Sequence, residues 1–186
     1  MPLRLLPAVL AFLAMAAMNA PAAEGPVFRY ALSMRSTRTP TGKKGLSPHG
    51  VSVDPQGNLY AADFEQGYVD KFSPEGKFLK SFGPFPGSTR NCSVDKDGNV
   101  YVASGGRLIK MDPDGKELLK WKIESDWYAT VHVGRYTQTV YVHAKKATVA
   151  FDTEGKKADL TFPKTENLWY LAEGADKKIY GISSPG

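Results

Sequence analysis

The sequence predicts an all-β protein made of short antiparallel strands that repeat about every forty residues. Two independent landmarks keep this period. One tyrosine ends each copy of a motif that reads as a turn followed by the start of a strand. These tyrosines lie 41, 40 and 39 residues apart, at Tyr60, Tyr101, Tyr141 and Tyr180. Glycines of a second turn lie 39 and 40 residues apart, at Gly76, Gly115 and Gly155. Self-similarity at a fixed period of this length is typical of repeat architectures.

The landmarks consist of turn-forming residues between alternating apolar residues. The first landmark reads VDPQGNLY over 53–60 and VDKDGNVY over 94–101, with weaker copies over 133–141 and 172–180. The second reads FSPEGK, MDPDGK and FDTEGK over 72–77, 111–116 and 151–156. Glycine at such a position supplies a positive φ, and this pattern is typical of tight β-hairpins.

Each repeat therefore contains strand, tight turn, strand, loop, strand, tight turn and strand. In the first repeat we expect strands over 49–54, 59–63, 68–72 and 78–82. Helical periodicity is absent beyond the N-terminal apolar run. Four short antiparallel strands in about forty residues form one blade of a β-propeller.

The predicted boundaries divide the chain into an N-terminal segment and a series of blades. Residues 23–45 hold a strand and a linker, and the blades occupy 46–83, 84–122, 123–162 and, in part, 163–186. A strand over 27–33 joining the last blade would close a four-bladed ring. We favour the alternative, a fragment of a six-bladed propeller with about three and a half blades present, because an open blade edge invites aggregation.

The first two repeats resemble the NHL-repeat family. The residues that carry the resemblance are PHGVSVDPQGNLYAAD over 48–63 and VDKFSPEGKFL over 69–79, and the later repeats are degenerate. The resemblance implies a β-propeller, commonly six-bladed, whose loops around a central channel bind ligands. It specifies the fold more than the function, because one fold hosts many functions.

The N-terminus has the order of a secretory signal peptide. Arg4 precedes an apolar run over 5–17, and Ala20 and Ala22 are small residues suited to a cleavage site. A membrane-spanning helix needs about 20 apolar residues, so we expect residues 1–22 to be a cleaved signal and the protein to be secreted or periplasmic. We expect no membrane span after cleavage.

The composition argues against a nucleic-acid partner and excludes an internal disulfide. The formal net charge is +5, but lysines alternate with acidic residues, which indicates a solvated surface, and we expect no nucleic-acid partner. The chain has one cysteine, Cys92, so it forms no internal disulfide. Cys92 lies in an apolar strand, which predicts a buried structural thiol.

The loops before the first strand of each blade supply the candidate binding residues. Alignment on the first turn makes His49, Arg90, Ala129 and Leu168 equivalent, with Tyr128 and Trp169 beside the last two. We predict a ligand-binding rim of His49, Arg90, Tyr128 and Trp169, suited to an anionic or planar ligand. The alternative is that these residues simply pack against the next blade.

No complete catalytic set can be assembled from the sequence, so we predict no catalytic residues, metal or cofactor. His132 and His143 fall in a first and a second strand, so neither repeats the place of His49. The leading hypothesis is an exported module that binds a small molecule, peptide, glycan or protein. Propeller enzymes similar to NHL proteins include metal-dependent lyases and lactonases, and the alternative hypothesis is a fragment of such an enzyme.

Overall fold

A computed structural model describes residues 48–124, 129–144, 147–162 and 168–183. All of these belong to the second of two compact units of the chain, residues 34–186. The predicted signal peptide, the predicted strand over 27–33 and Tyr128 lie outside the described residues. The described part holds strands and no α-helix, and so no helix there could cross a membrane.

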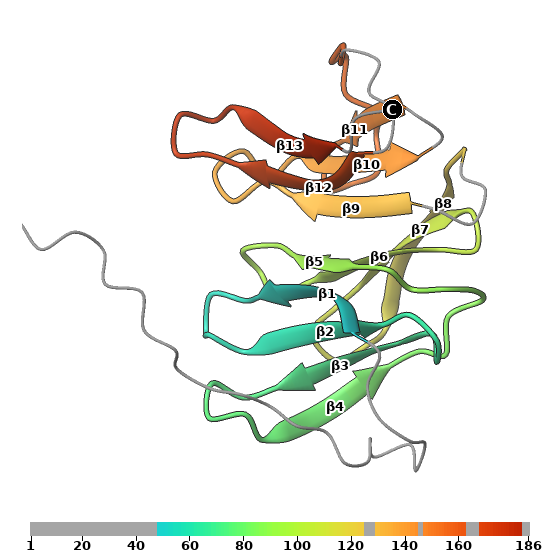
Figure 1. The fold of residues 1–186 in the computed structure, drawn as a ribbon, viewed down its shortest axis with the longest axis vertical. Coiled ribbons are helices and arrows are strands. Elements are labelled where there is room, and N and C mark those ends of the chain that lie inside the picture. The colour runs from blue at the N-terminus through green and yellow to red at the C-terminus, as the bar shows by residue number, and fades with distance from the viewer. Residues whose placement is uncertain (1–47, 125–128, 145–146, 163–167, 184–186) are drawn as a thin grey trace, which may run out of the picture. The chain divides into compact units, whose positions relative to one another are not determined.

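The strands form four separate antiparallel sheets, A to D, in chain order (Figure 1). Sheet A contains β1 (Pro48–Val53), β2 (Leu59–Asp63), β3 (Tyr68–Phe72) and β4 (Phe78–Phe82). Sheet B contains β5 (Cys92–Val94), β6 (Val100–Ser104), β7 (Arg107–Met111) and β8 (Glu117–Lys122). Sheet C contains β9 (Ala129–Val133), β10 (Val140–Ala144) and β11 (Ala147–Phe151), and sheet D contains β12 (Leu168–Glu173) and β13 (Ile179–Ser183).

The expected strands of the first repeat are confirmed. Three of the four have the predicted bounds, and the first strand starts and ends one residue earlier than predicted, at Pro48–Val53. The tyrosines of the repeat occupy one register position in all four sheets, opposite Ser52, Ser93, His132 and Ala172 of the first strands. The fold is thus an open, partial β-propeller, as predicted.

The third blade differs from its predicted four strands. After β11, the chain makes a single bridge between Phe151 and Lys157 and forms no strand up to residue 162. The corresponding β4 reads FLKSF and ends in the buried Phe82, whereas Leu160 is exposed and Pro163 has no N–H to donate to a ladder.

In sheets A and B, the turn between the first and second strands is organised by one aspartate. The carboxylate of Asp54 accepts backbone N–H groups of Gln56 and Asn58 and side-chain donors of Asn58 and Tyr60, at 2.8–3.1 Å. Burial opposes ionisation of Asp54, but these hydrogen bonds outweigh burial and lower its pKa. Gly57 completes the turn with φ 83°. Asp95 makes the same four contacts in sheet B.

The degenerate repeats keep a turn with a positive φ, but without glycine at that position. Gln138 and Lys177 adopt positive φ values of 55° and 61° in the turns of sheets C and D. Tyr180 still donates to an aspartate, Asp176, at 3.0 Å. A left-handed backbone is unfavourable for such side chains. Because these turns lack the expected glycine, the third and fourth repeats match the turn pattern of the first two only weakly.

The core lies between successive sheets. One buried cluster joins Tyr60, Ala62, Val69 and Phe82 of sheet A to residues of sheet B that include Cys92 and Val102. A second joins Tyr101, Ala103 and Leu108 of sheet B to the valines of sheet C. Cys92 is buried, as predicted, and burial raises the pKa of its thiol to about 12.

Candidate functional site

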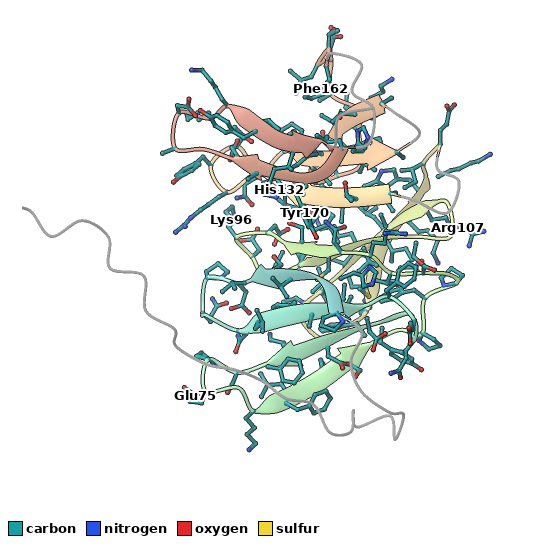
Figure 2. The ribbon with its side chains drawn as sticks, viewed as in Figure 1. Glu75, Lys96, Arg107, His132, Phe162 and Tyr170 are labelled. Atoms are coloured by element: carbon teal, nitrogen blue, oxygen red, sulfur yellow. The ribbon has the colours of Figure 1, made fainter. Side chains whose placement is uncertain are left out.

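The first strands of the four sheets, β1, β5, β9 and β12, are neighbours in space and line a common cavity. These four strands belong to different sheets, so no backbone ladder joins them. The cavity has a volume of about 650 Å³, which lies in the range of small-molecule sites. Lys96, His132 and Tyr170 are among its lining residues (Figure 2).

Asn91 replaces the missing ladder between β5 and β9. Its Nδ2 donates to the carbonyl oxygen of Val131 at 2.8 Å, and its Oδ1 accepts the backbone N–H of Val131 at 2.9 Å. One side-chain amide therefore pairs both polar groups of a residue forty positions away. Because buried backbone groups need such partners, Asn91 holds the spacing of two neighbouring blades at the cavity wall.

A second position repeats this kind of link from blade to blade. The Ser93 hydroxyl accepts the N–H of Val133 at 2.9 Å, and His132 Nε2 accepts the N–H of Glu173 at 3.2 Å. Burial lowers the pKa of His132, although the carboxylate of Glu173 opposes that shift. A neutral imidazole suits this contact, because Nε2 needs a free lone pair to accept a hydrogen bond from the amide N–H.

Glu173 connects β12 to the turn of sheet C. Its carboxylate accepts the backbone N–H groups of Tyr136 and Thr137 at 2.6 and 3.2 Å. Burial opposes ionisation, but the hydrogen bonds at Thr137 and Tyr136 outweigh it, so the pKa of Glu173 is lowered. The carboxylate is thus used in structure and is not poised as an acid.

The turn end of the cavity carries two cations, Lys96 and Arg135. Lys96 Nζ lies 2.7 Å from the Asp97 carboxylate, and its backbone N–H donates to Gln138 at 3.1 Å. Arg135 is exposed, and none of the ion pairs found in the described ranges involves it. The guanidinium of Arg135 therefore gives this end an unneutralised positive charge.

The opposite end of the cavity is crossed by Tyr170. Its hydroxyl donates to the carbonyl oxygen of His49 at 3.5 Å, so β12 and β1 meet here through one side chain. Tyr170 is 53% exposed. This long, exposed hydrogen bond is a weak contact by geometry, and a ligand can displace it.

The structure brings two of the four predicted site residues together on one aromatic ring. His49 stacks on Phe64 with ring centroids 4.4 Å apart, and the Arg90 guanidinium lies 4.8 Å from the same ring. Both residues immediately precede cavity-lining residues, Gly50 and Asn91, but neither lines the cavity itself. The cluster of His49, Phe64 and Arg90 therefore lies beside the part of the wall formed by Gly50 and Asn91, and Phe64 was not among the predicted site residues.

The predicted alignment of the fourth repeat needs a correction of one residue. Pro48 pairs with Asp63 and Gly50 with Ala62, which leaves His49 as a bulge. Leu168 pairs with Ser183 and Tyr170 with Ile182, which leaves Trp169 in the same role. Trp169, and not Leu168, is therefore the equivalent of His49. His49 and Trp169 both lie eleven residues before the tyrosine of their repeat, so alignment on the tyrosines gives this equivalence, whereas alignment on the first turn is one residue out in the fourth repeat.

The cavity-lining side chains Asn91, Ser93 and His132 were not predicted as site residues. A signal existed for Ser93 and His132, because Ser52, Ser93 and His132 put a polar residue at one place of successive first strands, but not for Asn91. The three histidines are each in a different setting, and His143 is buried, which lowers its pKa. Among the described residues no three His, Cys, Asp or Glu side chains gather as a metal site.

No family model matches the chain. The fold is similar to a virginiamycin B lyase from Staphylococcus aureus, at 13% identity and TM-score 0.62, covering 78% of this chain and 55% of that one. A streptogramin B lyase structure is similar at 12% identity and TM-score 0.61, covering 73% and 48%. Hydrazine synthase of Kuenenia stuttgartiensis is similar at 15% identity and TM-score 0.64, covering 84% and 46%.

These proteins share the propeller fold with this chain. The identities are too low to carry an activity from one protein to another, because one fold hosts many functions. The chain spans about half the length of each similar structure.

Proposed function

We propose that this chain is an exported NHL-type propeller module that binds a small anionic ligand in the cavity between its first strands. The observation that carries the proposal is the cavity of about 650 Å³, with the unneutralised Arg135 at its turn end. Concave sites that combine apolar walls with a few placed polar groups are the usual small-molecule sites of proteins.

The lining residues support an anionic ligand over a cationic one. Arg135 supplies the unpaired positive charge, since Lys96 already pairs with Asp97. The Ser93 hydroxyl accepts from Val133 and keeps its own hydrogen to donate along the wall. The acidic lining residues Asp54 and Asp95 are already saturated by their turns. A guanidinium binds carboxylate or phosphate through two parallel hydrogen bonds, so an acid with one such group fits this end.

A thermal-shift experiment tests this proposal with defined probes. The purified chain is screened against acetate, citrate, glucuronate, inorganic phosphate and matched organic cations, at constant ionic strength. We expect one or more anions to raise Tm, because a ligand bound only to the native state stabilises it. The shift should disappear in Arg135→Ala and persist in Arg107→Ala, whose arginine is also exposed but starts β7 and does not line the cavity.

Two results would contradict the proposal. One is that no anion of the panel raises Tm at millimolar concentration. The other is that Arg135→Ala and Arg107→Ala lose the shift equally, which would indicate general surface charge. Export is tested separately by N-terminal sequencing of secreted material, which should start near Ala23 or Glu24, and an intact Met1 would refute it.

A second candidate function is part of a propeller lyase, whose other catalytic residues lie outside the described residues. The observations that favour it are the fold shared with two lyases and the position of His49 next to the cavity-lining Gly50. Incubation with virginiamycin B, followed by mass spectrometry, tests this candidate. Product that forms with the parent chain and not with His49→Ala would favour the lyase, and unchanged substrate would count against it.

A further inference from the structure

The two terminal sheets of the described fold each leave one apolar face open. We call the face that carries Tyr60, Tyr101, Tyr141 or Tyr180 the front face of its sheet, and the opposite face the rear face. The front face of sheet A packs on the rear face of sheet B, and the front face of B packs on the rear face of C. Each interior interface thus joins one front face to one rear face.

The front face of sheet D has no such cover. Tyr180 is 55% exposed, whereas its equivalents Tyr60 and Tyr101 are fully buried. Ile182 is 66% exposed, and its equivalents Ala62 and Ala103 are buried. The same positions are therefore buried where a next sheet follows and open at sheet D.

The rear face of sheet A is open along β1. Val51 is 64% exposed, whereas its equivalents Cys92 and Val131 are 3% and 1% exposed. Val53 is 58% exposed, and its equivalent Val133 is buried. Farther out on this face Ala61 and Phe72 are buried, so the open part is a strip along the first strand.

We propose that a second copy of this chain covers both faces, so that the front face of sheet D in each copy packs on the rear face of sheet A in the other. The two open faces are of the kinds that pair at every interior interface. Sheet D has two described strands, both inner ones, which suits the narrow open strip along β1. Isolated exposed apolar residues need no explanation, but faces of this kind mark an interaction site.

Symmetry permits a closed ring of two copies. A front-to-rear contact closes into a ring of two when the rotation between copies is a half-turn, whereas other rotations give larger rings or an open filament. In the ring, each copy contributes its sheet D front face to one interface and its sheet A rear face to the other. One substitution, present in both copies, therefore alters both interfaces.

The interior interface shows which residues would meet across the contact. The Cys92 thiol lies 3.8 Å from the backbone oxygen of Tyr60. Val51 is the equivalent of Cys92, and Tyr180 is the equivalent of Tyr60. Val51 of one copy should therefore lie against Tyr180 of the other, which permits a charge-exchange test.

Light scattering coupled to size exclusion, on the purified chain at several concentrations, is the experiment. We expect a discrete species of twice the chain mass. Val51→Asp and Tyr180→Lys should each raise the dissociation constant of this species by about tenfold or more, as central interface residues do. An equimolar mixture of the two variants should recover it, because one of the two interfaces is then of the parent type and the other pairs opposite charges.

Leu118→Asp is the matched control, because Leu118 is 43% exposed but lies on the outer strand β8. This variant should associate like the parent. Circular dichroism checks that each variant folds, and Ile182→Lys replaces any variant that does not. A monomer at all concentrations, an open-ended series of masses, or a dimer indifferent to the Val51 and Tyr180 changes would each overturn the proposal, and a monomer would indicate that other blades of a longer protein cover these faces.

Discussion

Asn91→Ala should destabilise the fold measurably, because Asn91 is the link between β5 and β9. The substitution removes two hydrogen bonds, of 2.8 and 2.9 Å, and leaves the N–H and C=O of Val131 without this partner. Each hydrogen bond contributes about 1 kcal/mol, and an unpaired buried group costs about 1–3 kcal/mol. Asn91 is only half-buried, so water relieves part of the loss, and the lower end of the range, about 2–3 kcal/mol in total, applies.

Thermal denaturation followed by circular dichroism measures this effect. For a chain of this size, 1 kcal/mol corresponds to a change in Tm of about 2–4 °C, so Asn91→Ala should lower Tm by about 4–12 °C. Asn91→Asp should not rescue stability, because it keeps the acceptor for the Val131 N–H but places an oxygen against the Val131 carbonyl oxygen. Gln56→Ala is the control, since Gln56 is exposed and only its backbone N–H makes a hydrogen bond.

The reasoning would be refuted if Asn91→Ala changed Tm no more than Gln56→Ala. It would also be refuted if Asn91→Asp were as stable as the parent, because the amide donor would then be dispensable. In either case the spacing of the blades would depend on core packing alone.

Two further predictions concern the turns. Gly57→Val should cost about 1 kcal/mol or more in the free energy of unfolding, because valine is strained at φ 83°, and urea denaturation that showed no loss would contradict the turn assignment. Asp54→Asn should flatten the acid limb of the stability curve. The pKa of Asp54 is lowered in the folded state, so its contribution is present above the ordinary value of 3.8 and is lost as pH falls through the folded pKa; an unchanged acid limb in Asp54→Asn would argue against that role.

Local chemistry accounts for the part of the fold that the sequence determines. The hydrogen bonds of Asp54 reach no farther than Tyr60, and the positive φ of Gly57 lies within the same eight residues. Such short-range patterns repeat along the chain, so the strands, the turns and the common position of the four tyrosines follow from sequence. The burial of Cys92 follows as well, because its apolar neighbours alternate with the period of a strand.

Contacts between blades decided the rest. Asn91 meets Val131 and His132 meets Glu173 across forty or more residues, and no local pattern marks which polar side chain will bridge two first strands. Strand pairing alone shows that His49 and Trp169 are bulged out of their ladders. Residues 152–162 form no fourth strand of sheet C. Whether they do so depends on whether their backbone groups bond more favourably to β11 or to water. Whether an apolar side chain such as Val51 is open or covered depends on which sheet lies next to it, and only tertiary structure supplies that neighbour.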